Sequence, residues 1–318
     1  MRSAFIRTLV DLAEQDDRIV LVVGDLGFGV VEPFASRFPD RFVNAGVAEQ
    51  NMTGIAAGMS LSGKVVFTYS IGNFPTLRCF EQIRNDVCYH GANVKIVSVG
   101  AGLAYGALGV SHHATEDVAV MRALPGMTVV APADPVETEM ATRAVAALAG
   151  PAYLRLGRAG EPAVHQDTVV FQVGKAIQVT EGDDITLIAA GTMVHTAVQA
   201  ARMLASNSIH ARVLSMHTIK PLDEDAILAA ARETAAIITI EEHGIIGGLG
   251  SAVAEVLAER WPQGTSFKRL ALPSQFTSLV GSQSYLKEAY SLSVSGIVNA
   301  ALQTYEAAHL PQQVCRVH

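Results

Sequence analysis

Short apolar segments alternate with helix-like stretches along most of this 318-residue chain, and this alternation restricts the fold more than any other feature. Strands that are separated by helices pair in parallel through right-handed crossovers, so helices cover both faces of the sheet. The apolar segments fall into two series, at residues 18–23, 65–68, 94–99 and 127–131, and then at residues 185–190, 212–214, 236–240 and 268–272. We therefore predict an α/β protein with two three-layer domains, each built on a parallel sheet.

The alternation is interrupted between about residues 157 and 182, where Pro162 and several glycines occur and no helical period is present. We place the domains at residues 1–160 and 181–318. Residues 161–180 form the predicted linker, with room for one short strand at residues 168–172.

Charge and cysteine content argue against several classes of protein. The net charge is −7 and Lys and Arg form no cluster, whereas binding to nucleic acid needs a basic surface. Cys79, Cys88 and Cys315 are too few and too far apart for a disulfide framework or a zinc site. No apolar run approaches the roughly 20 residues of a membrane span. We expect a cytoplasmic protein that binds neither nucleic acid nor a membrane.

The loop after the first predicted strand does not form a nucleotide site of a known type. In open parallel sheets, ligands bind beyond the carboxyl ends of the strands. The loop there is GDLGFG at residues 24–29, which has the order G-x-x-G-x-G and not the dinucleotide order G-x-G-x-x-G. The Walker pattern is absent from the sequence as well. An NAD site and a P-loop are therefore not expected.

A second loop carries a glutamate at the start of a predicted helix, in FVNAGVAEQNM at residues 42–52. A carboxylate in the first helical turn often does no more than complement the helix dipole. The order of the neighbouring residues indicates more, because GVAEQNM resembles the G-[IV]-A-E-[QH]-x-M segment of the transketolase family. The glutamate of that segment is Glu49 here.

The resemblance to transketolases covers nearly the whole chain. The other matching segments are YS at residues 69–70, EQIR at 81–84, SHHATED at 111–117, APAD at 131–134, HTIKPLD at 217–223, and EEHG with GGLGS at 241–251. The resemblance implies a thiamine-diphosphate-dependent transferase that moves a two-carbon ketol unit from a ketose or ketose-phosphate donor to an aldehyde acceptor.

The resemblance also implies which residues act. Glu49 would hydrogen-bond the pyrimidine ring and favour the tautomer that lets the cofactor remove its own thiazolium proton. Phe74 would stack on that ring, with Asp25 and Gln82 as further cofactor residues. His112 would contact substrate oxygens and act with Glu49 as a catalytic residue. From the residues alone, Phe74 as a core aromatic, His112 as a structural histidine and Asp25 as a turn acid remain open.

One expected motif is missing. Thiamine enzymes hold the diphosphate through Mg²⁺ with a G-D-G motif, and no G-D-G occurs in this sequence. We therefore predict no metal ligand in this chain. Mg²⁺ and the diphosphate would be held by an N-terminal transketolase subunit, in a heterotetramer with two copies of each chain.

The predicted substrate end departs from the family pattern. Arg2 and Arg158 match arginines that grip phosphate, although either is equally explained as a surface or interface residue. Leu108 stands where the family commonly has an acid that contacts a sugar hydroxyl of the substrate. The other departures are Gly100 in place of a His, Gly29 in place of a Ser, and Ile71 in place of an aromatic residue. These changes predict an atypical substrate.

Two other functions remain open. The chain also resembles domains of deoxyxylulose-phosphate synthase and of the β subunit of 2-oxo acid dehydrogenases, which decarboxylate a 2-oxo acid. The second alternative is a regulatory subunit that has kept the fold without catalysis. The presence of Glu49 argues against that alternative.

Overall fold

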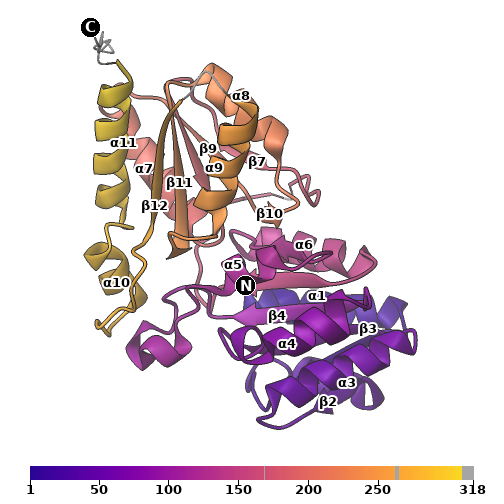
Figure 1. Cartoon of the computed structure of the whole chain (residues 1–318). Helices are drawn as coiled ribbons and strands as arrows, with labels where there is room; N and C mark the ends of the chain where they lie inside the picture. Colours follow the sequence, from indigo (N-terminus) through magenta and orange to yellow (C-terminus); the bar gives the residue numbers. More distant parts are fainter. Residues whose placement is uncertain (168, 262–264, 310–318) are drawn as a thin grey trace, which may run out of the picture.

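The structure is a computed structural model, and it describes residues 1–167, 169–261 and 265–309. The chain forms two stacked α/β units, each built around one mostly parallel sheet (Figure 1). The fold class predicted from the alternation of strands and helices is confirmed. No helix in the described residues is long and apolar enough to cross a membrane.

The first unit contains a seven-stranded sheet. Its strands, in spatial order, are β10 (Thr218–Lys220), β5 (Thr128–Val130), β6 (Ala152–Leu156), β4 (Val94–Val99), β3 (Val65–Ile71), β1 (Ile19–Val23) and β2 (Phe42–Asn44). All neighbours pair in parallel except β10, which runs antiparallel to β5. The carboxyl ends of β1, β2, β3 and β4 therefore meet at one edge, where ligands bind in such sheets.

Helices cover both faces of this sheet because its inner strands are apolar on both sides. In β1, Leu21 and Val23 pack in one cluster with Phe5 of α1, whereas Val20 and Val22 pack in another cluster with Met52 of α3. The helices of this unit are α1 (Arg2–Gln15), α2 (Glu32–Arg37), α3 (Glu49–Leu61), α4 (Phe80–Gln82), α5 (Asp117–Ala123) and α6 (Pro135–Ala147). A π-helical turn at Ile83–Cys88 continues α4.

The second unit contains a five-stranded sheet. Its strands, in spatial order, are β12 (Ser266–Leu272), β11 (Ala236–Gly244), β8 (Ile185–Ala189), β9 (Ala211–Ser215) and β7 (Ile177–Thr180). Only β7 is antiparallel to its neighbour. In Figure 1, α7 (Met193–Ala205) and α11 (Val294–His309) lie on one side of the sheet, and α8 (Glu224–Glu233) and α9 (Leu249–Arg260) on the other. A further short helix, α10 (Gln283–Ala289), precedes α11.

Two details differ from the sequence prediction. No strand is present at residues 169–172, and Thr168 lies outside the described residues, as does Cys315. The strand of this stretch is β7, whose edge position follows from its pairing with β9. The second detail is β10, which comes late in the chain but closes the edge of the first sheet. Both strands are set by long-range pairing, which leaves little local signal in the sequence.

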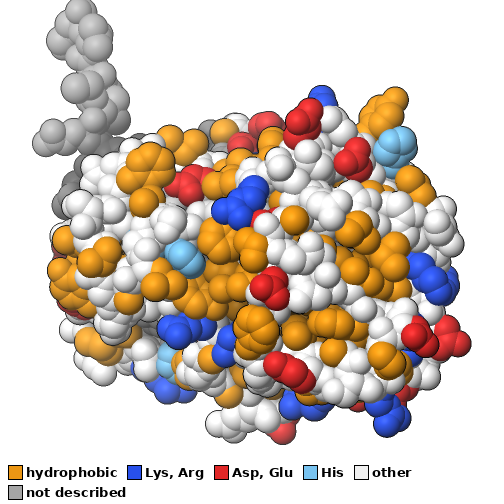
Figure 2. Space-filling model, turned by 90° about the horizontal axis from the view of Figure 1, so that it is seen from below, with side chains coloured by type: hydrophobic (Ala, Val, Ile, Leu, Met, Phe, Trp, Pro, Cys, Tyr) orange, Lys and Arg blue, Asp and Glu red, His pale blue; other side chains and the backbone are white. Residues whose placement is uncertain are grey.

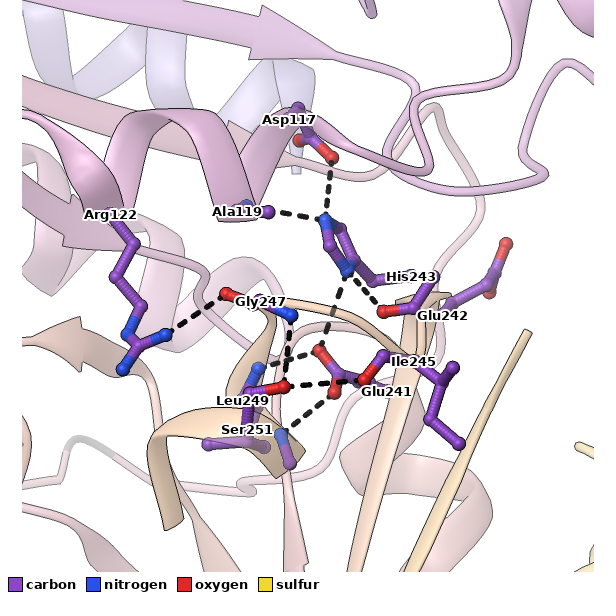
Figure 3. Close-up of polar contacts among 12 residues, drawn as sticks. Asp117, Ala119, Arg122, Glu241, Glu242, His243, Ile245, Gly247, Leu249 and Ser251 are labelled. Atoms are coloured by element: carbon purple, nitrogen blue, oxygen red, sulfur yellow. Dashed lines mark hydrogen bonds and ion pairs between the residues drawn. The ribbon is translucent and has the colours of Figure 1, made fainter. Parts of the chain in front are cut away.

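A buried polar cluster joins the two units. The Arg155 guanidinium donates to the Asp117 carboxylate at 2.7 Å and to the main-chain oxygen of Glu242 at 3.1 Å. Figure 3 shows the His243 ring between Asp117 and Glu241. The Nδ1 atom of His243 is within hydrogen-bond distance of the main-chain oxygen of Gly244, at 2.8 Å. Since breaking such a buried pair costs several kcal/mol, this cluster fixes one unit against the other.

Candidate active site

Glu49 begins α3 directly beyond the carboxyl ends of β1 and β2 and is only 2% exposed. Its side chain lies against Gly24, where a Cβ atom would be 3.4 Å from Glu49 Cγ. Gly46, at φ +74°, allows the tight turn between β2 and α3. The bend of the chain thus directs a carboxylate into the sheet edge instead of leaving it in solvent.

The Glu49 carboxylate has a cationic partner. Arg78 Nη1 donates to Glu49 Oε2 at 2.8 Å, and the Arg78 side chain is about half exposed. Burial raises the pKa of the nearby Cys79 thiol to about 11, and the charge of Glu49 adds to the rise. The thiol is therefore neutral at physiological pH.

Aromatic rings continue the site from Arg78. The guanidinium carbon of Arg78 lies 4.7 Å from the centroid of the Phe74 ring, in a cation–π contact. The Phe74 ring meets His112 edge-on, with centroids 5.2 Å apart and an interplanar angle of 72°. His112 Nδ1 is 3.0 Å from Ser111 Oγ, which leaves Nε2 for a ligand.

The contacts extend further through a tyrosine to a second arginine. The Tyr105 ring lies 6.3 Å from the His112 ring, and the Arg158 guanidinium lies 5.1 Å from the centroid of Tyr105. A continuous series of contacts therefore connects a buried carboxylate with an exposed arginine. We call it the contact row: Glu49, Arg78, Phe74, His112, Tyr105 and Arg158.

The contact row contains four of the residues singled out from the sequence, namely Glu49, Phe74, His112 and Arg158. Leu108 lies in the same loop as Tyr105 and is 56% exposed.

Three other predicted residues are not members of the row. Asp25 follows β1 at φ +56°, and its carboxylate accepts from the Asn44 amide at 2.9 Å. Arg2 begins α1, and its Nε is buried without a hydrogen-bond partner in the described residues. The same holds for Gln82 Oε1. Neither Asp25 nor Gln82 makes a hydrogen bond or an ion pair with the contact row in the part of the chain that the structure describes.

Sequence reasoning missed Arg78 and Tyr105. Arg78 follows Phe74 by four residues in the stacking segment, a spacing that was visible but gave no role. Tyr105 lies five residues after Gly100, which stood out only as a departure from the family pattern. The neighbouring His113 is buried and contacts the oxygen of Gly106 at 3.4 Å, so it belongs to the loop and not to the row.

The glycine-rich segment of the second unit is not part of the site. Glu241 Oε2 accepts from the Leu249 amide at 2.7 Å and Oε1 accepts from the Gly250 amide at 2.8 Å, as Figure 3 shows for Leu249. Gly247, at φ +78°, makes the turn that precedes α9. Because the free amides at the start of α9 are already capped by a carboxylate, this segment is a helix start and not a phosphate cradle.

Comparisons with known proteins agree with this geometry. Residues 1–160 match the family model of the transketolase pyrimidine-binding domain, and residues 174–297 match that of the transketolase C-terminal domain. The chain is 41% identical over 304 residues to one of the subunits of apulose-4-phosphate transketolase from Phocaeicola vulgatus, covering 95% of this chain and 96% of that protein. It is 40% identical over 307 residues to a subunit of 6-deoxy-6-sulfo-D-fructose transketolase from a Clostridium species, covering 96% and 94%.

A solved structure is similar over the same length. It is described as a split-gene transketolase in an inactive beta4 tetramer, and it is 40% identical to this chain with a TM-score of 0.86. The match covers 96% of this chain and 97% of that one.

Proposed function

The chain belongs to the transketolase family, and on that premise we propose that it is the pyrimidine-binding subunit of a two-subunit, thiamine-diphosphate-dependent transketolase. The observation that carries the proposal is the inner end of the contact row. There a carboxylate that is 2% exposed lies beside an aromatic ring at the carboxyl edge of a parallel sheet. Residues 1–160 would be the pyrimidine-binding domain, residues 161–180 the linker and residues 181–318 the C-terminal domain.

The residues present fit an aminopyrimidine ring. Such a ring has a flat face for an aromatic side chain and a nitrogen edge for a carboxylate, and Phe74 and Glu49 offer these two groups within the span of one arginine side chain. Bound thiamine diphosphate would supply the carbanion chemistry of ketol transfer. Glu49 would hold a proton at the ring nitrogen, with Phe74 stacked on the ring face.

The other residues of the row fit a sugar substrate. His112 presents Nε2 where a substrate oxygen would be held, and Arg158 offers the two-pronged donor that suits a tetrahedral oxyanion. Arg2 is a second candidate for that anion, because its buried Nε lacks a partner in the described residues. Two similar proteins are named for a sugar phosphate and a sulfo-sugar, which supports a ketose with an anionic group and an atypical carbon skeleton.

We also propose a partner subunit that supplies the diphosphate and Mg²⁺ site. The sequence has no G-D-G motif, and the inactive state named for the similar beta4 tetramer fits a chain that is incomplete alone. Apolar side chains near the site would be covered by that partner, since Phe28 is 75% exposed and Val47 is 74% exposed. The face of the first unit seen in Figure 2 also shows patches of hydrophobic side chains between scattered charges. A cytoplasmic heterotetramer with two copies of each chain is the proposed assembly.

The test is a substrate screen on this chain purified together with its partner subunit. Ketol transfer to aldehydes is measured from xylulose 5-phosphate, apulose 4-phosphate and 6-deoxy-6-sulfofructose, with CO₂ release from pyruvate measured in parallel. Transfer from at least one ketose, without CO₂ release, is the expected result. Release of CO₂ would instead identify a 2-oxo acid enzyme, and an inert complex that binds no cofactor would identify a regulatory subunit. Ordinary transketolase rates with xylulose 5-phosphate and ribose 5-phosphate would contradict the atypical substrate.

A further inference from the structure

In the loop that follows β4, the Tyr105 ring packs directly against Gly100. Gly100 comes directly after Val99, the last residue of β4, and has φ +89°. A Cβ atom at this position would lie 2.1 Å and 2.3 Å from two carbons of the Tyr105 ring. Both the backbone conformation and the space thus require glycine, and the Tyr105 ring fills the space that a side chain at position 100 would use.

The Tyr105 ring is buried between His112 and Arg158, at the outer end of the contact row. It is 9% exposed, with the His112 ring 6.3 Å away and the Arg158 guanidinium 5.1 Å from its centroid. Arg158 itself is exposed and makes no ion pair within the described residues. The aromatic face is therefore the main contact that holds the guanidinium in place.

The second unit fixes the loop that carries Tyr105. Glu242 Oε1 accepts from the Leu103 amide at 2.6 Å, and Gln283 and Lys287 of α10 hold the same carboxylate at 2.8 Å and 3.0 Å. At Gly106, a Cβ atom would lie 2.4 Å from Leu286 Cδ1, so the loop touches α10 with no space between them. The loop is thus attached to the second unit on both sides of Tyr105 in the chain, at Leu103 and at Gly106.

Beyond Tyr105 lies a cavity of about 520 Å³ between the two units, lined by Arg158, His195 and Lys287 among others. Lys287 is neutralised by Glu242, and the lining Glu161 is neutralised by the N-terminal amine at 2.9 Å. Burial lowers the pKa of His195, and the charges of Arg202 and Lys287 lower it further, so that imidazole is neutral. Among the described residues that line this cavity, the uncompensated charge is the guanidinium of Arg158.

We propose that Tyr105 determines substrate specificity by positioning Arg158 at the outer end of the contact row. The selected substrate is a sugar whose terminal tetrahedral oxyanion, a phosphate or a sulfonate, reaches the cavity between the units. This inference rests on the proposed function and adds a residue and a charge requirement to it. Because the Tyr105 ring fills the space of a side chain at position 100, no side chain at that position contacts the anion, and Arg158 is the cation that binds it in this cavity. The distance from His112 to Arg158 then sets the length of the sugar that is accepted.

The experiment compares the two-subunit complex of the wild type with Tyr105→Leu and Tyr105→Phe. Loss of the aromatic face in Tyr105→Leu should raise KM for a sugar phosphate and a sugar sulfonate about 2- to 30-fold, with kcat and thiamine diphosphate affinity nearly unchanged. Tyr105→Phe keeps the ring and should keep KM. The uncharged ketose erythrulose should be used equally well by all three complexes. Tyr89→Leu, which removes a ring that is 86% exposed, is the matched control.

Binding of inorganic phosphate to the same complexes gives a second readout that does not need turnover. It should weaken by the same factor in Tyr105→Leu and remain in Tyr105→Phe. The inference is overturned if Tyr105→Leu changes charged and uncharged substrates alike, or if it leaves both KM and phosphate binding unchanged. A larger effect on only one of the two charged sugars identifies phosphate or sulfonate as the native group. Failure of the proposed function is a different result, namely a wild-type complex that binds no thiamine diphosphate and transfers no ketol unit.

Discussion

The inner and outer ends of the contact row are built in opposite ways. At the inner end Glu49 is buried and paired with Arg78, whereas at the outer end Leu108 and Arg158 are exposed and Arg158 makes no ion pair in the described residues. The inner end rests on the first unit, and the outer loop is held by Glu242 and α10 of the second. If the inner end binds the cofactor and the outer end the substrate, as proposed, this difference predicts that changes at one end leave the function of the other end intact.

The largest expected effect is at the inner end. Glu49→Gln keeps the size of the side chain but removes the carboxylate, and it should lower kcat/KM of the two-subunit complex by about 10²- to 10⁴-fold, because general acid–base assistance is lost. Steady-state ketol transfer is the measurement. The control is Glu224→Gln, an exposed carboxylate in the first turn of α8, which should retain activity. A Glu49→Gln complex within about threefold of wild type would contradict the assignment.

The next effect tests whether the second unit supports only the outer end. Glu242→Gln weakens the hydrogen bond to the Leu103 amide and leaves Lys287 without its carboxylate. We expect a loss of about 1.5–3 kcal/mol in the free energy of unfolding, measured by urea denaturation. The KM for anionic sugars should change as well, because the Tyr105 loop loses a support and Lys287 becomes a second uncompensated cation on the cavity. Thiamine diphosphate affinity should stay the same. A clear rise in the Kd for thiamine diphosphate would show that the second unit supports the inner end as well as the outer end.

A smaller effect is expected from the aromatic ring of the inner end. Phe74→Leu removes the stacking surface, and it should raise the Kd for thiamine diphosphate about 2- to 10-fold, since aromatic stacking contributes about 0.5–1.5 kcal/mol. Calorimetry on the complex measures this. Phe276→Leu removes a ring that is 78% exposed and serves as the control. An unchanged Kd would identify Phe74 as an ordinary core residue.

The smallest effect concerns Arg78, which contacts both proposed pyrimidine groups. A pyrimidine ring that binds Glu49 and Phe74 would have to displace the Arg78 guanidinium from one or both of them. Arg78→Met should therefore lower the Kd for thiamine diphosphate about 1.5- to 5-fold, because a half-exposed ion pair contributes about 0.2–1 kcal/mol. Arg84→Met, at an exposed arginine of the π-helical turn, is the control. Weaker binding by Arg78→Met would mean that the guanidinium supports the bound cofactor.

Much of the fold was predictable because the inner strands are buried on both faces. A run such as residues 18–23 is apolar at nearly every position, which is typical of a parallel strand under two layers of helices. The edge strands were not predictable. Three residues of β10 join the first sheet only because β5 offers an open edge, and β7 is specified by β9 in the same way.

The site was predictable in part for a similar reason. Glu49, Phe74, His112 and Arg158 were proposed from residue type and order, and the structure brings them into one row. Their roles stay predictions. Arg78 and Tyr105 depend on contacts between segments that are distant in sequence, such as the exclusion between Gly100 and the Tyr105 ring. Such contacts become visible only when the backbone is in place.

The most direct test of the central claim is the binding of thiamine diphosphate with Mg²⁺, measured by calorimetry on this chain alone and on its complex with the partner subunit. The account predicts tight binding in the complex, weak or no binding by the lone chain, and loss of activity in the Glu49→Gln complex. Tight binding by the lone chain would contradict a diphosphate site on the partner. A well-formed complex that binds no thiamine diphosphate would contradict the catalytic role itself.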